Sequence, residues 1–394
     1  MVAKAAPGDL LEVTTVAERH DYSIAQIDRV VRAGPARRVP PCPYADRCGG
    51  CDWQQISYAA QLEIKAGLIA AGLGRALRAD ISPDGLLEPA EAEFGYRSRV
   101  RFQAEPRGGI GFHEPSGNRL VEVDRCLVAA DTIAVPKTLA MALAGHCSGI
   151  EVIDDGAGGQ VLVIDFAKKP TPGDVTTVNR CIANDPAIRG AVLVGGGQRQ
   201  KVGDPAIAIE LEPGLTINFD GDLFSQVNRS LNRRMIEYVM GLADPGPTTT
   251  ILDLFCGAGN FSLPAARRGA QVTGVDSVNE AIEAARRSAR ILGFGDRAQF
   301  IAMKAADTAR FLGRANYHAD TVILDPPRAG ANLLVASLIR LRPARIVYVS
   351  CNVATLARDL SAIAGGGYGL GALRAFDLFP NTHHVEVIAE MLLT

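Results

Sequence analysis

The chain has 394 residues, a formal net charge of −2 and 47% hydrophobic residues, and it is long enough for two or three domains with separate cores. The N-terminal residues lack the apolar core of a secretory signal, and no apolar run is long enough to span a bilayer, so the sequence predicts a cytoplasmic protein. The near-neutral charge means that any nucleic-acid-binding surface must be a local basic patch.

Residues 1–41 form a short N-terminal segment. It contains one predicted strand at 10–16 and a second segment at 24–31, after which several prolines interrupt regular structure. The segment is short for an independent core.

Four cysteines suggest a metal centre. Cys42, Cys48 and Cys51 lie close together, with two glycines inside the final C-x-x-C, and Cys126 follows far along the chain. Thiolates packed this closely repel one another unless a cation holds them. The set suits either tetrahedral zinc or an iron–sulfur cluster, and the spacing alone does not separate the two. Cys147 and Cys181 have no such neighbours and are expected in the core.

The central part of the chain is predicted to be mainly β. A helix is expected at 58–79, and from residue 88 to 220 the pattern changes to short strands with one or two helices, one of them at 131–146. Arg97, Arg99 and Arg101 alternate with other residues and so share one strand face. That face is either a stripe that follows phosphates or an ordinary solvated surface.

The C-terminal part alternates strands with helices, which predicts a doubly wound, mostly parallel sheet after a helix at 230–242. Strands are expected at 251–255, 271–275, 298–302, 321–324, 346–350 and 384–391, and helices at 260–268, 278–292, 331–341 and 353–363. Ligands of such sheets bind outside the carboxyl ends of the strands.

The strand at 346–350 delivers Cys351 to that edge. A lone cysteine at a strand end is most often a small buried hydrophobe, so this strand does not by itself indicate catalysis.

A nucleotide-type loop follows the first strand of this part. Gly257 and Gly259 let the backbone pass close to a ligand, and Asp276, at the end of the second strand, can accept hydrogen bonds from ribose hydroxyls. The third glycine of a dinucleotide loop is missing, which disfavours a pyrophosphate. The better candidate is S-adenosylmethionine.

Together these motifs resemble the RNA (uracil-5-)-methyltransferases, in particular the iron–sulfur branch that acts on 23S ribosomal RNA. The resemblance covers residues 42–394. Its motifs occur in one order, namely Cys42-x5-Cys48-x2-Cys51 with Cys126, Phe224-Ser-Gln226-Val-Asn228, Asp253-Leu-Phe-Cys-Gly-Ala-Gly-Asn260-Phe261, Asp325-Pro-Pro-Arg-Ala-Gly330, Ser350-Cys351-Asn352 and Phe379-Pro-Asn-Thr-His-His-Val-Glu386.

The resemblance implies roles for particular residues. Cys351 would be the nucleophile that adds to carbon 6 of uracil, and Glu386 would accept the proton from carbon 5. The target uracil would be flipped out of folded RNA to reach the thiol. The expected contacts of S-adenosylmethionine are Gln226, Phe255, Asn260, Asp276 and Asp325, and the expected ligands of a [4Fe–4S] cluster are Cys42, Cys48, Cys51 and Cys126.

The resemblance also implies the fold and the domain division. We expect an α/β protein in which a Rossmann-like class I methyltransferase domain, 221–394, follows a mainly β iron–sulfur domain, 42–220, whose helix at 58–79 packs on the catalytic domain. Residues 1–41 are too few for the five-stranded TRAM barrel that many relatives carry.

The sequence is also compatible with other functions. The same chemistry could act on a uridine of transfer RNA, or the chain could methylate another substrate. A non-catalytic RNA-binding protein with a structural zinc is a third alternative. Nothing in the sequence requires a membrane or an obligatory protein partner.

Overall fold

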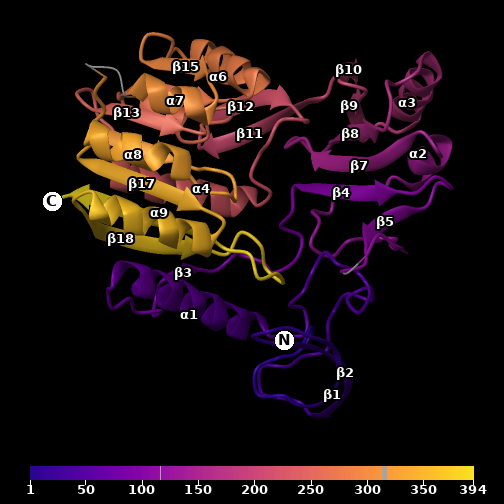
Figure 1. Cartoon of the computed structure of the whole chain (residues 1–394). Helices are drawn as coiled ribbons and strands as arrows, with labels where there is room; N and C mark the ends of the chain where they lie inside the picture. The colour runs from indigo at the N-terminus through magenta and orange to yellow at the C-terminus, as the bar shows by residue number, and fades with distance from the viewer. Residues whose placement is uncertain (116, 313–316) are drawn as a thin grey trace.

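A computed structural model describes residues 1–115, 117–312 and 317–394. Figure 1 shows the C-terminal sheet and its helices on the left, the central sheet on the right and an N-terminal hairpin below them. None of the helices in the described residues combines the length and the apolar character that crossing a bilayer would need.

The C-terminal sheet has eight strands in the order β15-β14-β13-β16-β17-β19-β18-β3. The strands from β15 to β17 are parallel, and β19 runs antiparallel to both of its neighbours. The predicted doubly wound, mostly parallel sheet is therefore confirmed. Its strands are β3 (Leu87–Glu88), β13 (Thr250–Leu254), β14 (Gln271–Asp276), β15 (Ala298–Ala302), β16 (Thr321–Leu324), β17 (Arg345–Ser350), β18 (Tyr368–Phe376) and β19 (Glu386–Leu393).

Helices cover both faces of this sheet because its central strands are apolar on both sides. In β17, Val347 and Val349 pack in one core with α4, α5 and α6, whereas Ile346 and Tyr348 pack in the other with α1, α7, α8 and α9. These helices are α1 (Tyr58–Leu77), α4 (Arg229–Ala243), α5 (Ser262–Arg267), α6 (Asn279–Ile291), α7 (Ala305–Leu312), α8 (Asn332–Leu341) and α9 (Val353–Gly365).

The central sheet has seven strands in the order β10-β9-β8-β7-β4-β5-β6, and β11 pairs with β12 in a separate hairpin. Helices α2 and α3 pack against the larger sheet. The bounds are β4 (Arg99–Ala104), β5 (Ile110–His113), β6 (Leu120–Glu122), α2 (Lys137–Ala142), β7 (Cys147–Asp154), β8 (Gln160–Phe166), α3 (Pro172–Asn184), β9 (Ile188–Gly195), β10 (Gln198–Gly203), β11 (Ala206–Glu212) and β12 (Leu215–Asp220).

The helix predicted at 131–146 was wrong in extent, since only α2 forms there. Pro136 precedes α2 as its N-cap, and the residue before a proline is kept out of the helical region by steric clash. Gly145 has a φ of 78°, outside the helical range, and β7 begins two residues later at Cys147.

The N-terminal segment forms one antiparallel hairpin, β1 (Leu10–Glu18) with β2 (Ser23–Arg32). Helix α1 follows the segment that carries the first three cysteines and lies against α9, along the edge of the C-terminal sheet (Figure 1). Residues from the first quarter of the chain thus complete one side of the C-terminal sheet, where β3 also pairs with β18.

Candidate active site

Cys351 is held between a strand and a helix. It follows Ser350, the last residue of β17, and precedes Asn352, the N-cap of α9. The Asn352 side-chain oxygen accepts a hydrogen bond from the backbone N–H of Ala354 at 3.0 Å, and the Ser350 hydroxyl accepts one from the N–H of Asn352 at 3.2 Å. Both bonds fix the turn that carries the half-buried thiol.

One cavity of about 790 Å³ lies at the carboxyl ends of the parallel strands. It brings together every residue that the sequence singled out for catalysis or cofactor contact, although they come from distant parts of the chain. These residues are Gln226, Phe255, Asn260, Asp276, Asp325, Cys351 and Glu386.

The cofactor side of the cavity is built by local hydrogen bonds. One carboxylate oxygen of Asp276 accepts the N–H of Gly257 and the other accepts the N–H of Val278, each at 2.9 Å. Gly259 has a φ of 100°, and a Cβ there would lie 2.9 Å from the Leu263 side chain, so a larger residue would displace the loop.

Asn260 is fixed by a residue that sequence reasoning missed. Its side-chain amide exchanges two hydrogen bonds with Asn232 of α4, at 2.9 and 3.2 Å, and Asn232 lines the same cavity. Asn232 lies within α4, at helical spacing from core residues, and so gave no sequence signal.

The loop that carries Gln226 is tied to the central sheet. Arg99 donates to the carbonyl of Leu223 at 2.8 Å and pairs with Glu151 at 2.7 Å, and the Ser98 hydroxyl donates to the carbonyl of Val227 at 3.0 Å. Arg99 is buried, so its side chain supports the cavity wall and belongs neither to a phosphate-following stripe nor to a solvated face.

Burial dominates the electrostatics around the thiol. Glu386, the first residue of β19, is 3% exposed, and its burial, assisted by the charge of Asp325, raises its pKa well above the usual range. Burial likewise raises the pKa of Asp325 to about 7. Burial first, and then the charge of Glu386, raises the pKa of the Cys351 thiol. A carboxylate in this setting is a stronger base than one in water.

Arg328 opposes these effects, and sequence reasoning assigned it no role. Its positive charge lowers the pKa values of both Cys351 and Glu386. Its guanidinium lies 3.0 Å from Nε2 of His384, whose pKa burial lowers to about 4, so the ring is neutral and can accept a hydrogen bond. The signal was available in the motif, because Arg328 directly follows the two prolines after Asp325.

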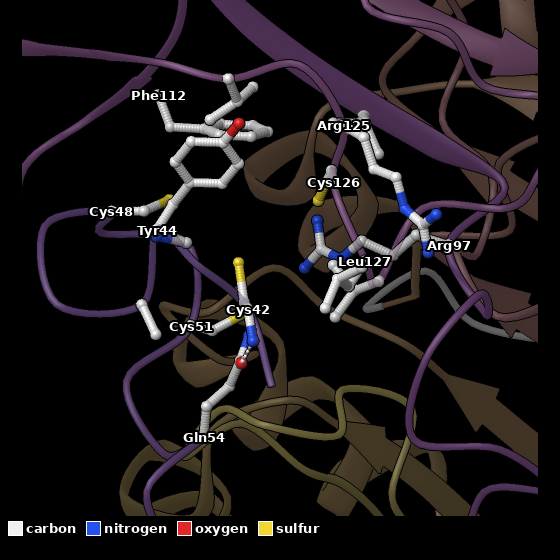
Figure 2. A pocket seen from close by; sticks show the side chains of 15 residues that line it. Cys42, Tyr44, Cys48, Cys51, Gln54, Arg97, Phe112, Arg125, Cys126 and Leu127 are labelled. Carbon is white, nitrogen blue, oxygen red and sulfur yellow. Dashed lines mark hydrogen bonds between the residues drawn. The ribbon is translucent and has the colours of Figure 1, made fainter. Parts of the chain in front are cut away.

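A second, smaller cavity holds the cysteines (Figure 2). Cys42, Cys48, Cys51 and Cys126 all line it, none forms a disulfide, and its volume is about 60 Å³. Burial raises the pKa of Cys51 to about 11 and also raises the pKa values of Cys48 and Cys126. Within the described residues, no three His, Cys, Asp or Glu side chains are arranged to hold a metal ion.

Comparisons with known proteins agree with this geometry. The sequence profile of the tRNA (uracil-5-)-methyltransferase family matches residues 213–393. The 23S rRNA (uracil(1939)-C(5))-methyltransferases RlmD of Shewanella amazonensis and Pseudomonas putida are each 33% identical to 98% of this chain, which covers 88% and 87% of their lengths. The chain belongs to the RNA (uracil-5-)-methyltransferase family.

A solved structure of this family extends the likeness to the whole fold. The Pyrococcus abyssi tRNA (uracil-54, C5)-methyltransferase, in complex with S-adenosyl-L-homocysteine, is 26% identical and has a TM-score of 0.76 over 99% of this chain and 95% of its own. The C-terminal sheet therefore has the class I methyltransferase fold, as expected. The methyl donor of this RNA (uracil-5-)-methyltransferase is S-adenosylmethionine, whose demethylated product is the ligand in that complex.

Proposed function

We propose that this protein transfers a methyl group from S-adenosylmethionine to carbon 5 of a uridine in 23S ribosomal RNA, through a covalent bond between Cys351 and the base. The observation that carries the proposal is the meeting of Cys351, Glu386 and the Asp276 loop in one cavity. The RlmD relatives support the ribosomal substrate, because they are 33% identical over 98% of the chain, whereas the Pyrococcus abyssi tRNA enzyme is 26% identical.

Cys351 begins the reaction. Carbon 5 of uracil is a poor nucleophile, and addition of the thiolate to carbon 6 forms an S–C bond and turns the ring into an enolate. The charge of Arg328 favours the thiolate by lowering its pKa against the effect of burial. Because the cavity encloses the half-buried thiol, the uracil has to leave its stack to reach it.

The cofactor residues orient the second step. S-adenosylmethionine, when bound, supplies the methyl group that carbon 5 takes from its sulfonium. Asp276 would accept hydrogen bonds from the ribose hydroxyls, while Gln226, Phe255 and Asn260 line the rest of the proposed cofactor cavity. Asp325 lies between these residues and Cys351 in the proposed arrangement, where it orients the cofactor or the thiol.

Glu386 completes the turnover. It removes the proton from carbon 5, the electrons restore the double bond between carbons 5 and 6, and the S–C bond breaks to release the Cys351 thiolate. The raised pKa of Glu386 suits this step, because a buried carboxylate holds an abstracted proton more strongly than an exposed one.

We also propose that the four cysteines hold a [4Fe–4S] cluster. Four thiols outside any disulfide line one cavity, and burial makes the thiolates of Cys48, Cys51 and Cys126 unfavourable without a bound cation. A cluster would tie residues 42–51 to Cys126 and order the proposed central domain, 42–220, between the N-terminal segment, 1–41, and the catalytic domain, 221–394. Iron and sulfide analysis tests this assignment, and a colourless protein that contains zinc would replace it.

A uridine of transfer RNA is the second candidate substrate, favoured by the similarity to the Pyrococcus abyssi enzyme. Mapping 5-methyluridine in ribosomal and transfer RNA, from cells with and without this protein, distinguishes the two. Loss of one site in 23S RNA alone is the expected result.

Replacing the nucleophile tests the covalent mechanism. We expect Cys351→Ala to lose methyl transfer to RNA completely, and Cys181→Ala, a change in the central domain, to retain it. The unaltered protein should form a covalent adduct with RNA that carries 5-fluorouridine, and this adduct should survive denaturation. Fluorine at carbon 5 cannot leave as a proton, so the bond to Cys351 is not released. Clean separation of protein and RNA despite bound cofactor would exclude the covalent mechanism.

A further inference from the structure

The segment between β18 and β19, residues 377–385, leads directly into Glu386. We call it the β18–β19 loop. Phe379 and His384 of this loop line the catalytic cavity together with Glu386. Glu386 is paired with Phe376 of β18, and the loop adjoins it on its N-terminal side, so displacement of the loop should shift the proposed base.

Asn381, in the middle of this loop, is fully buried and has a φ of 66°, in the left-handed region. Its N–H donates to the Gln61 side chain at 2.8 Å, and its carbonyl accepts the N–H of Trp53 at 3.0 Å. Its side-chain oxygen accepts from Arg38 at 2.9 Å, and its side-chain nitrogen donates to the carbonyl of Glu93 at 2.8 Å. All these partners belong to the first hundred residues of the chain.

Other contacts of the loop come from the same region. Asp52, directly after Cys51, accepts a hydrogen bond from the N–H of His383 at 3.3 Å and lies 2.8 Å from its ring nitrogen. The Tyr96 hydroxyl donates to the carbonyl of Pro380 at 3.1 Å. The segment with the cysteines thus contacts the loop through Asp52 and Trp53, the two residues directly after Cys51.

We propose that Asn381 is a positioning residue for proton removal, through which the folded cysteine segment sets the place of Glu386. This inference rests on the proposed function. Cys351 and the Asp276 loop are held by β17, α9 and β14, and among the described residues Asn381 makes no hydrogen bond to these elements. Displacement of the β18–β19 loop should therefore slow the last step and spare addition and methyl transfer.

The slowed step has a direct signature. When the proton stays on carbon 5, the methylated base remains bonded to Cys351, so a denaturation-resistant complex accumulates with ordinary uridine RNA. We expect Asn381→Gly, which permits the same φ but removes the side-chain bonds, to lower kcat about 10- to 100-fold and to leave KM for S-adenosylmethionine unchanged.

The matched control is Asp244→Gly, which changes another left-handed residue at the end of α4. It should keep normal turnover and form no lasting complex. Hydrogen exchange of residues 377–385 should accelerate in Asn381→Gly and in Asp52→Ala, and not in the control. The Asp52 variant separates the contribution of the cysteine segment from that of Asn381 itself.

Two results would overturn the inference alone, provided that the unaltered protein makes 5-methyluridine. One is a loss of turnover in Asn381→Gly without any accumulated complex, and the other is unchanged hydrogen exchange of the loop in both variants. An unaltered protein that methylates no uridine would instead overturn the proposed function, and this inference with it.

Discussion

The two sides of the catalytic cavity are built in different ways. On the cofactor side, Asp276 holds the loop at Gly257, nineteen positions away, and Asp253 accepts a hydrogen bond from Ser262, nine positions away. On the base side, Asp52 contacts His383 across 331 positions and Lys65 pairs with Asp377 across 312.

This difference separates two kinds of dependence. The loop at Gly257 belongs to a strand–loop–helix unit whose contacts are local, and on this side, within the part of the chain that the structure describes, only the Gln226 loop relies on the distant residues Ser98 and Arg99. The base side is complete only when the N-terminal third of the chain has docked on the catalytic sheet. Damage near the cysteines should therefore affect proton removal more than cofactor binding.

The largest expected effect is on the base side. Glu386→Gln should lower turnover about 10²- to 10⁴-fold, because the amide cannot accept the proton from carbon 5. The covalent RNA complex should accumulate, which denaturing gels would detect. Glu390→Gln is the control on the same strand, since Glu390 pairs with Arg345 away from the cavity. Normal turnover in Glu386→Gln would remove this residue from the mechanism.

The buried pair that anchors the β18–β19 loop should matter for stability. Burial lowers the pKa of Lys65 and raises the pKa of Asp377, so each needs its partner to remain charged. Lys65→Met should lower the free energy of unfolding by about 3–5 kcal/mol.

Urea unfolding measures this loss against Arg29→Met, which breaks the exposed pair with Glu12 and should cost less than about 1 kcal/mol. Equal losses in the two variants would contradict the view that docking of α1 fixes the base side.

On the cofactor side we expect a smaller and more selective effect. Asp276→Asn replaces one of the two carboxylate oxygens that accept hydrogen bonds from the loop N–H groups. A hydrogen bond to a charged group contributes about 1.5–3 kcal/mol to stability, so its loss should loosen the cofactor loop. KM for S-adenosylmethionine should rise about 10- to 100-fold with little change in kcat. Asp307→Asn, on the exposed face of α7, serves as the control in the same titration, and a pure loss of kcat would argue against a binding role for Asp276.

The smallest effect concerns pH. Burial raises the pKa of Asp253 from 3.8 to about 7, so between these values the folded protein binds more protons than the unfolded chain. The free energy of unfolding should therefore fall as the pH rises through this window, by at most about 1.4 kcal/mol per pH unit for this group.

Asp253→Asn removes this titration and should make the dependence shallower, while Asp325, whose pKa is also about 7, keeps part of it. Unfolding by urea at pH 5 and pH 7 tests the difference. Identical slopes in the two proteins would show that Asp253 does not titrate in this range.

Sequence patterns predicted the parallel strands well, and the exceptions have physical causes. Strand β18 was missed because Gly369 and Gly371 lower its strand propensity, and β3 was missed because two residues carry no periodicity. Arg99 has the alternation of a surface strand, yet its guanidinium is buried against carbonyls more than a hundred residues away. Arg328 lies within one of the motifs of the resemblance, but the motif did not indicate its role. Only the structure shows that its positive charge lies near the Cys351 thiol and beside His384.

The sequence by itself determined the alternation of strands and helices, the cofactor loop and the identities of the reactive side chains. These depend on local periodicity, on glycine conformations and on residue chemistry. The tertiary structure decided which residues meet and how burial changes their pKa values. It also placed the cysteine segment beside the loop that leads into the proposed base, because such contacts depend on how distant segments pack, and no local pattern encodes that.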